Sequence, residues 1–187
     1  MIIDAIIVAA GRGERAGGGI PKQFRSLAGR SVLARTLDAL AGHAAIRRAV
    51  VVVNPQDTDH VEAVRQETAR SFTTVPGGAT RTDSVRAGLA ALAGDAPDAV
   101  MIHDAARPFL SAELIDRLAE ALDRHDAVIP ALPATDALMR VMTDGMIAEP
   151  VDRAVVRAAQ TPQAFRFDAL SAAYARLGGG GLADDAA

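Results

Sequence analysis

The stretch "IIVAAGRGERAGGGIPKQF", residues 6–24, joins an apolar run to a loop rich in glycine and basic side chains. The run starts near Met1 and is apolar almost throughout, which is typical of a strand buried on both faces of a parallel sheet. The loop ends at Lys22, the only lysine among the 20 basic residues, of which the others are arginine. We infer that this position requires a lysine.

The loop matches neither of two common phosphate-binding motifs. The spacing Gly11-x-Gly13-x-x-Ala16 fits the dinucleotide fingerprint, but that motif needs an acidic residue about 20 positions later, where the sequence reads "SVLART". A Walker A loop needs glycine directly before the lysine and Ser or Thr after it, whereas proline and glutamine flank Lys22. Both motifs are therefore excluded.

A glycine-rich turn at the carboxyl end of a strand remains, and open parallel sheets bind ligands at this edge. Glycine lets backbone N–H groups approach a triphosphate closely, and Arg15 and Lys22 add positive charge. The alternative is a loop that is rich in glycine only by composition.

The rest of the chain alternates short apolar runs with helical patterns. We expect further strands at 49–54, 71–75, 98–104 and 127–132, and helices at 31–42, 57–70, 80–94, 111–125, 153–160 and 167–178. Such alternation predicts an α/β fold with a three-layer, mostly parallel, Rossmann-like sheet that forms a single domain over residues 1–187.

Residues 133–152 break this alternation and predict a protruding β-hairpin arm. The turn is expected at Thr143-Asp144-Gly145. The arm contains apolar residues that a small domain does not easily cover, so we interpret it as a dimerisation element. A surface hairpin folded on its own domain is the alternative.

Composition excludes several classes of function. The chain has no cysteine, and its histidines (His43, His60, His103, His125) show no metal-ligand spacing. A net charge of −3 gives no general footprint for nucleic acid. The first apolar run lacks a basic leader, and no run approaches the length of a membrane span. We expect a soluble, cytoplasmic protein without a nucleic-acid or membrane partner.

Two further loops follow strands and therefore lie at the same edge of the sheet. "HDAARP", residues 103–108, presents Asp104, a hard oxygen ligand suited to Mg²⁺ or another divalent cation. Asp104 could instead cap a turn or pair with Arg107. "PGGATRTDSVRAG", residues 76–88, leads Arg81 and Ser84 into a helix whose N-terminus attracts anions.

Glycine amides, cations and one carboxylate on one edge are suited to nucleotidyl transfer, which depends on positioning and charge stabilisation. A phosphate monoester is already ionised near neutral pH and needs no general base. The sequence contains no Ser-His-Asp arrangement and no GxSxG motif, so hydrolase chemistry is disfavoured.

With "AAGRGERAGGGIPKQF", "GGATRTDSV", "HDAARPF", "VDR" and "TPQAF" in order, the chain resembles the methylerythritol phosphate cytidylyltransferases over essentially its whole length. The resemblance implies transfer of a cytidylyl group from CTP to methylerythritol phosphate by a homodimeric nucleotidyltransferase. It implies nucleotide contacts by Ala10, Gly11, Gly13, Gly78, Arg81, Ser84 and Ala105. It further implies charge stabilisation by Arg15 and Lys22, metal binding by Asp104, and substrate contacts by Arg107, Thr161 and Arg153, the last supplied by the partner subunit.

The chain departs from the family pattern at two places. Family members commonly have a threonine where Ala137 stands, and alanine cannot make its hydrogen bond to substrate. The family also continues beyond "LADDAA", so we expect a C-terminal truncation, with the chain forming the N-terminal part of a longer or a bifunctional cytidylyltransferase/cyclodiphosphate synthase protein.

Other functions remain open at this point. A ribitol 5-phosphate cytidylyltransferase shares the loop signatures, and a sugar-phosphate or molybdopterin nucleotidyltransferase would use GTP or UTP. A non-catalytic CTP-binding dimeric module would bind CTP without turnover. An NAD-dependent oxidoreductase is disfavoured because the ribose-binding acid is missing.

Overall fold

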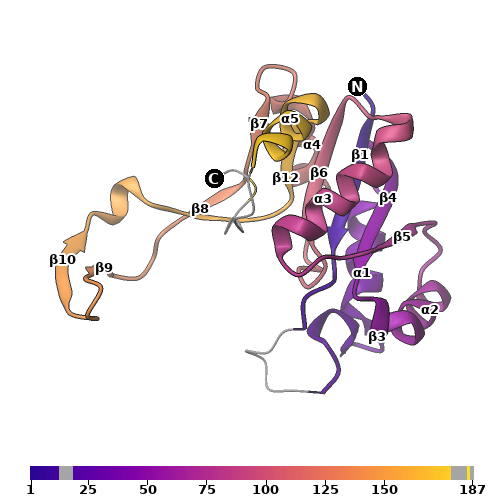
Figure 1. Cartoon of the computed structure of the whole chain (residues 1–187), viewed down its shortest axis with the longest axis horizontal. Helices are drawn as coiled ribbons and strands as arrows, with labels where there is room; N and C mark the ends of the chain where they lie inside the picture. Colours follow the sequence, from indigo (N-terminus) through magenta and orange to yellow (C-terminus); the bar gives the residue numbers. More distant parts are fainter. Residues whose placement is uncertain (13–18, 178–184, 186–187) are drawn as a thin grey trace.

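In the part of the chain that the structure describes, residues 1–12, 19–177 and 185 of a computed structural model, six strands form the central sheet. Their order is β5-β4-β1-β6-β12-β7 (Figure 1). Their bounds are Thr73–Pro76, Ile46–Val53, Ile3–Val8, Ala99–Asp104, Gln163–Arg166 and Ala127–Val128, in that order. β1 pairs in parallel with β4 and β6, and β4 with β5, whereas β12 is antiparallel to both neighbours.

Helices cover both faces of this sheet and complete the three predicted layers. One buried cluster joins α1 (Val32–Leu40), α2 (Thr58–Glu67) and α4 (Ala112–Ala121) to one face. A second joins α3 (Arg81–Leu92) and α5 (Phe167–Arg176) to the other face. None of the helices among the described residues has the length and apolar character needed to cross a bilayer.

Short elements connect these layers. Within the described residues, the 3-10 helices are η2 (Lys22–Phe24), η3 (Pro55–Asp57), η4 (Ala93–Asp95) and η5 (Arg153–Val155). Three small two-stranded sheets pair β2 (Ser26–Leu27) with β3 (Arg30–Ser31), β8 (Ala131–Pro133) with β11 (Arg157–Ala159), and β9 (Leu138–Val141) with β10 (Ile147–Val151).

The first strand is buried on both faces, as its apolar sequence predicts. Ile7 packs in the α1 cluster and Ile6 in the α3 cluster, and both are fully buried. Asp4 is fully buried too, and it is neutralised by Arg47 and Arg48, whose nitrogens lie 2.7 and 2.8 Å from its Oδ2. Because a buried carboxylate is costly without such partners, this ion pair joins β1 firmly to β4.

The register of the parallel strands brings their carboxyl ends to one level. Val8 is aligned with Val52 of β4 and with Asp104 of β6. Backbone bonds extend the pairing, from Ala9 N to Val52 O at 2.8 Å and from Ala105 N to Val8 O at 3.1 Å. The loops after β1, β5 and β6 therefore leave the sheet along one edge, as predicted.

Two predicted elements differ from the structure. The expected strand at 127–132 is divided into β7 and β8, because Pro130 between them has no N–H group for a continuing ladder. The expected helix at 153–160 is wrong: the segment forms η5 and then β11. Antiparallel pairing with β8, extended by the bond from Gln160 N to Pro130 O at 2.8 Å, satisfies its backbone instead.

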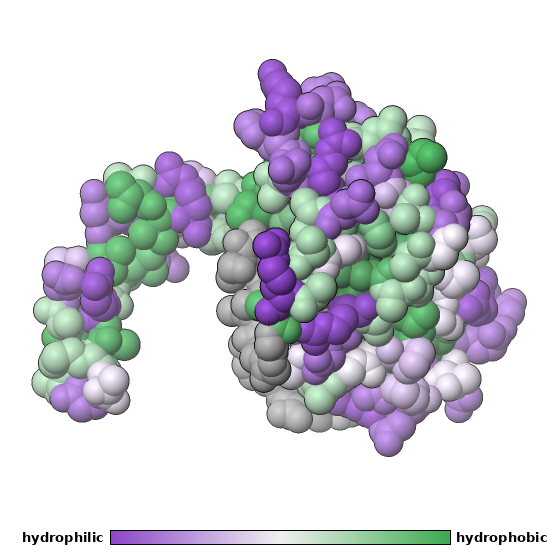
Figure 2. Space-filling model, turned by 45° about the horizontal axis from the view of Figure 1, so that its top comes forward, coloured by the Kyte–Doolittle hydropathy of each residue, from purple (hydrophilic) through white to green (hydrophobic). Residues whose placement is uncertain are grey.

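The arm is a hairpin, as predicted, and it projects away from the sheet (Figure 1). β9 and β10 meet at a turn in which Gly145 has φ of +84°, a conformation that glycine adopts without strain. Apolar side chains cover much of its surface (Figure 2), and the large ones that are exposed are Met139, Val141, Met142, Met146 and Ile147.

Candidate active site

A cleft of about 1240 Å³ lies at the carboxyl edge of the sheet. Its walls come from the loops after β1, β5 and β6 and from residues 159–161. It brings together ten of the residues predicted from sequence: Ala10, Gly11, Lys22, Gly78, Arg81, Ser84, Asp104, Ala105, Arg107 and Thr161.

The other three predicted residues are Gly13, Arg15 and Arg153. Gly13 and Arg15 lie outside the described residues. Arg153 belongs to η5 at the base of the arm, where it is exposed and its Nη1 donates to Thr135 O at 3.0 Å. The cleft is thus formed without Arg153.

Lys22 is exposed on the cleft wall, while the residues beside it are buried. The Nε2 of Gln23 donates to Ala9 O at 2.6 Å and to Gly11 O at 3.1 Å. The Phe24 ring stacks on the His60 ring with centroids 5.0 Å apart. Because Gln23 ties η2 to the start of the glycine-rich loop, the backbone of Lys22 is fixed relative to that loop.

The loop after β5 packs against the loop after β1 because Gly77 lacks a side chain. A Cβ on Gly77 would lie 2.5 Å from the Cβ of Ala10 and 2.9 Å from the Oγ of Ser84. A Cβ on Gly78 would lie 2.3 Å from the Cβ of Asp83. Glycine at position 77 therefore lets this loop contact the loop after β1, and glycine at position 78 lets it contact the first turn of α3.

Helix α3 points its N-terminus at the cleft. Thr80 and Asp83 form a capping box, in which the Asp83 N–H donates to Thr80 Oγ1 at 3.0 Å. Ser84 donates its hydroxyl proton to Thr80 O at 3.0 Å, so the lone pairs of its oxygen stay available as acceptors. The helix end offers an anion both a favourable dipole and backbone donors.

Arg81 lies between two carboxylates. Its Nη1 is 2.6 Å from Asp185 Oδ2, and its Nη2 is 3.5 Å from Asp104 Oδ1. Burial alone would lower the pKa of Arg81, but the attraction of these carboxylates raises it above its ordinary value. Asp185 also accepts a hydrogen bond from the hydroxyl of Tyr174 at 2.6 Å. Burial of this hydroxyl raises the pKa of Tyr174.

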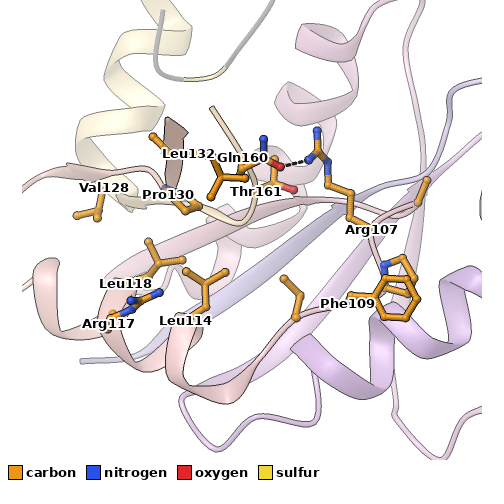
Figure 3. A pocket seen from close by; sticks show the side chains of 14 residues that line it. Arg107, Phe109, Leu114, Arg117, Leu118, Val128, Pro130, Leu132, Gln160 and Thr161 are labelled. Atoms are coloured by element: carbon orange, nitrogen blue, oxygen red, sulfur yellow. Dashed lines mark hydrogen bonds between the residues drawn. The ribbon is translucent and has the colours of Figure 1, made fainter. Parts of the chain in front are cut away.

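Asp104 also pairs with Arg107, as one of the sequence alternatives proposed. The Arg107 Nε donates to Asp104 Oδ2 at 3.0 Å, and its Nη1 donates to the Oε1 of Gln160 (Figure 3). On the far side of this arginine lies an apolar hollow of about 710 Å³, lined by Phe109, Leu110, Leu114, Leu118, Val128, Pro130 and Leu132 among others. The Arg107 side chain thus separates the polar cleft from an apolar one.

A divalent ion fits this cleft only if most of its ligands come from outside the protein. The described residues hold no group of three His, Cys, Asp or Glu side chains that could form a metal site. Asp104 supplies one carboxylate, with 34% of its side chain exposed on the cleft wall. Mg²⁺ is commonly bound by one or two carboxylates together with substrate phosphates and water, and Asp104 is suited to that arrangement.

Sequence reasoning missed three side chains that shape the cleft. Gln23 and Arg12 anchor the first loop, the latter through a bond from its Nη2 to Asn54 Oδ1 at 3.2 Å and another to Gln56. His103 is fully buried behind Asp104, and burial lowers its pKa to about 4. A polar residue at the end of an otherwise apolar strand was the only signal for His103.

Residues 3–187 match the family described as IspD, 2-C-methyl-D-erythritol 4-phosphate cytidylyltransferase. The chain belongs to this cytidylyltransferase family. Family membership confirms the resemblance inferred from the loop motifs, and the solved relatives confirm the mostly parallel α/β fold.

Several relatives in this family are longer than the chain. A bifunctional enzyme IspD/IspF from Maricaulis maris is 58% identical over 187 residues, which are 100% of this chain and 49% of that protein. One from Rhodospirillum rubrum is 47% identical, over 99% of this chain and 48% of its own length. The chain thus spans about half the length of the curated relatives it matches.

Solved structures agree in fold. The 4-diphosphocytidyl-2C-methyl-D-erythritol synthase of Anaerococcus prevotii superposes with a TM-score of 0.85 at 30% identity, over 99% of this chain and 81% of that one. The bifunctional IspDF of Campylobacter jejuni gives 0.80 at 26% identity, over 100% of this chain and 46% of that one.

Replacing Gly77 by alanine tests the contact between the first two loops. We expect Gly77→Ala to raise the dissociation constant for CTP by about tenfold or more, because the new methyl group would overlap Ala10 and Ser84 and push the two loops apart. Calorimetric titration with CTP measures this change. Gly94→Ala is the control, since nothing lies within 4 Å of its added Cβ. Equal CTP affinity in both variants would contradict the required contact.

Proposed function

We propose that this chain transfers the cytidylyl group of CTP to 2-C-methyl-D-erythritol 4-phosphate and releases pyrophosphate, a step in the non-mevalonate route to isoprenoid precursors. Membership of the cytidylyltransferase family supports this activity. The observation that carries it is the single cleft in which Lys22, Asp104, Arg107 and the N-terminus of α3 meet.

The nucleotide is proposed to lie across the loops after β1 and β5. The triphosphate would accept hydrogen bonds from backbone amides near Ala10 and Gly11, and Arg81 and Ala105 would flank it. The cytosine would lie against Gly78 and Ser84, and the Ser84 hydroxyl oxygen can accept a hydrogen bond from the exocyclic amine.

In the reaction, a phosphate oxygen of the polyol phosphate attacks the α-phosphorus of CTP. One P–O bond forms, the bond from the α-phosphorus to the β-phosphate oxygen breaks, and pyrophosphate leaves with the electron pair. The attacking phosphate is ionised near neutral pH, so no protein base needs to take a proton.

Lys22 stabilises the charge that develops on the α-phosphate oxygens, and Arg15, in the same loop, is proposed to assist. Each described arginine on the cleft wall has a carboxylate within 4.0 Å. Within the described residues no such carboxylate lies beside Lys22. Its charge is therefore available to the phosphate, which accounts for the chain's single lysine.

Asp104 would hold a divalent cation, Mg²⁺ or a similar ion, together with the triphosphate. When bound, such an ion neutralises phosphate charge as the bond to the leaving group breaks. Arg81 and Arg107, which contact Asp104, keep the carboxylate on the cleft wall.

The polyol phosphate is proposed to lie near Arg107 and Thr161. Arg153 would reach it from the arm of a partner subunit, because within one chain Arg153 does not line the cleft. Ala137 offers no hydroxyl to this substrate. We propose that the arm selects the polyol. Because Ala137 departs from the family pattern on this arm, ribitol 5-phosphate is the second candidate substrate.

A homodimer formed through the arm is part of this proposal. The arm exposes Met139, Val141, Met146 and Ile147, with exposed fractions between 48% and 65%. Apolar surface of this kind, on an extended hairpin, is typical of protein interfaces. Contact with a second copy of the chain would bury this apolar surface. We propose that the dimer acts in the cytoplasm.

The activity is tested by pyrophosphate release with CTP, Mg²⁺ and 2-C-methyl-D-erythritol 4-phosphate. We expect release with this pair and none when UTP or GTP replaces CTP, because the cytosine contacts of Ser84 and Gly78 are specific. Preference for ribitol 5-phosphate would identify the other polyol as substrate. CTP binding without release in any mixture would instead identify a non-catalytic CTP-binding module.

Lys22→Ala tests the role of the single lysine. We expect kcat to fall by a factor on the order of 10² to 10³, with the melting temperature unchanged, because the side chain stabilises charge and is not part of the core. Steady-state kinetics and a thermal melt measure both effects. Arg124→Ala removes one positive charge from an exposed site away from the cleft and serves as control. A near-normal kcat in Lys22→Ala would refute the mechanism.

Glutamates on the arm test dimerisation. Val141 and Ile147 are cross-strand partners and both are exposed. We expect Val141→Glu/Ile147→Glu to convert a dimer to a monomer in sedimentation velocity, because charges would be buried at the interface. Thr143→Glu at the turn is the control. A dimer that survives the double substitution, or a wild-type monomer, would exclude the arm as the interface.

A further inference from the structure

His103 links two segments of the cleft wall without lining the cleft. It is fully buried near the end of β6, directly before Asp104. Its Nε2 lies 2.9 Å from the backbone oxygen of Arg107, and its Nδ1 lies 2.9 Å from the Oγ1 of Thr161. One imidazole thus contacts the loop after β6 and the segment before β12.

The partners of the ring fix its tautomer. A backbone carbonyl can only accept, so Nε2 must carry the proton that it donates to Arg107 O. In the neutral ring Nδ1 then accepts, and the hydroxyl proton of Thr161 points at it. The Thr161 oxygen accepts in turn from the Asp104 N–H at 3.3 Å. Every donor in this series therefore has an acceptor.

These hydrogen bonds connect the two ends of the loop from Asp104 to Arg107, which carries the proposed functional side chains. They hold the Asp104 backbone at one end and the Arg107 backbone at the other. The Arg107 N–H also donates to Asp104 O at 3.1 Å, and the Arg107 side chain contacts Asp104 and Gln160. The positions of the Asp104 carboxylate and the Arg107 guanidinium therefore depend on His103.

We propose that His103 is a positioning residue for cytidylyl transfer, acting through Thr161 and the Arg107 backbone to set Asp104 and Arg107 on the cleft wall. The inference rests on the proposed function and gives the Thr161 hydroxyl a different role from the substrate contact suggested by family resemblance. Its oxygen faces the buried imidazole and the Asp104 amide. A misplacement of catalytic groups by about 1 Å can cost on the order of 10²-fold in rate, so a buried side chain can matter this much.

Four substitutions separate the hydrogen bonds from packing. His103→Leu removes both ring contacts, whereas the amide of His103→Gln can still donate to Arg107 O. Thr161→Val removes the hydroxyl at nearly constant volume, and Thr161→Ser keeps it. We expect kcat/KM to fall by about 10- to 100-fold in the Leu and Val variants, the range typical of residues that orient a ligand-binding group. The Gln and Ser variants should recover most of the loss.

The double variant His103→Leu/Thr161→Val distinguishes positioning from direct substrate contact. If Thr161 acts through His103, the two losses are not additive, and the double variant is about as active as either single variant. Additive losses would mean that Thr161 contacts the substrate directly, and would overturn the proposal. Where His103→Leu does not fold, the comparison of Thr161→Val with Thr161→Ser decides, and equal activity in that pair would overturn it.

A readout that does not need activity is the nitrogen NMR spectrum of the histidine side chains, with the His103 signals assigned by their loss in His103→Gln. We expect a neutral ring protonated at Nε2, and a shifted Nδ1 resonance in Thr161→Val. Protonation at Nδ1 would contradict the proposal. If the spectrum is as expected but the protein releases no pyrophosphate, the proposed function is wrong and the hydrogen bonds of His103 are still confirmed.

Discussion

The parallel pairing of β1 with β4 and β6 is the constraint on which the cleft depends. Val8 is aligned with both Val52 and Asp104, so the strands end at one level and their loops start from one edge. Apolar residues on both faces of β1 and the buried ion pair of Asp4 with Arg47 and Arg48 hold this register. A slip of one residue would exchange the two faces of the strand and misplace every loop at once.

Residues outside the proposed chemistry hold the three loops in place. Gln23 ties Lys22 to the first loop, Gly77 lets the second loop touch the first, and His103 joins the two ends of the third. The site is thus positioned largely by side chains bonded to backbone atoms, which suits the proposed reaction because it relies on orientation and electrostatics more than on proton transfer.

The sequence predicts the parts of this structure that local patterns control. Apolar runs predict the strands, and glycine-rich stretches predict the loops that follow them. Because parallel strands end at the same edge of the sheet, the sequence also predicts that Lys22, Ser84 and Asp104 lie close together. The segment 153–160 was mistaken for a helix, because its pairing partner β8 is distant in sequence. Gln23 and His103 were missed because their bonds reach backbone oxygens that no motif reveals.

Charge pairing could not be predicted either. Asp104 has the sequence context of a metal ligand, yet in the folded chain it also accepts from Arg107 and lies near Arg81. Arg81 in turn contacts Asp185, more than 100 residues away. Only the fold decides which cations are paired with carboxylates, and among the described residues of the cleft wall each arginine has such a partner, whereas no such partner lies beside Lys22.

The most direct measurement is a crystal structure with CTP and Mn²⁺, in which the anomalous signal locates the metal. We expect the triphosphate along the loop after β1, the Lys22 Nζ on the α-phosphate, and the metal on the Asp104 carboxylate. A nucleotide bound outside this cleft, or one bound with Lys22 and Asp104 both away from the phosphates, would contradict it.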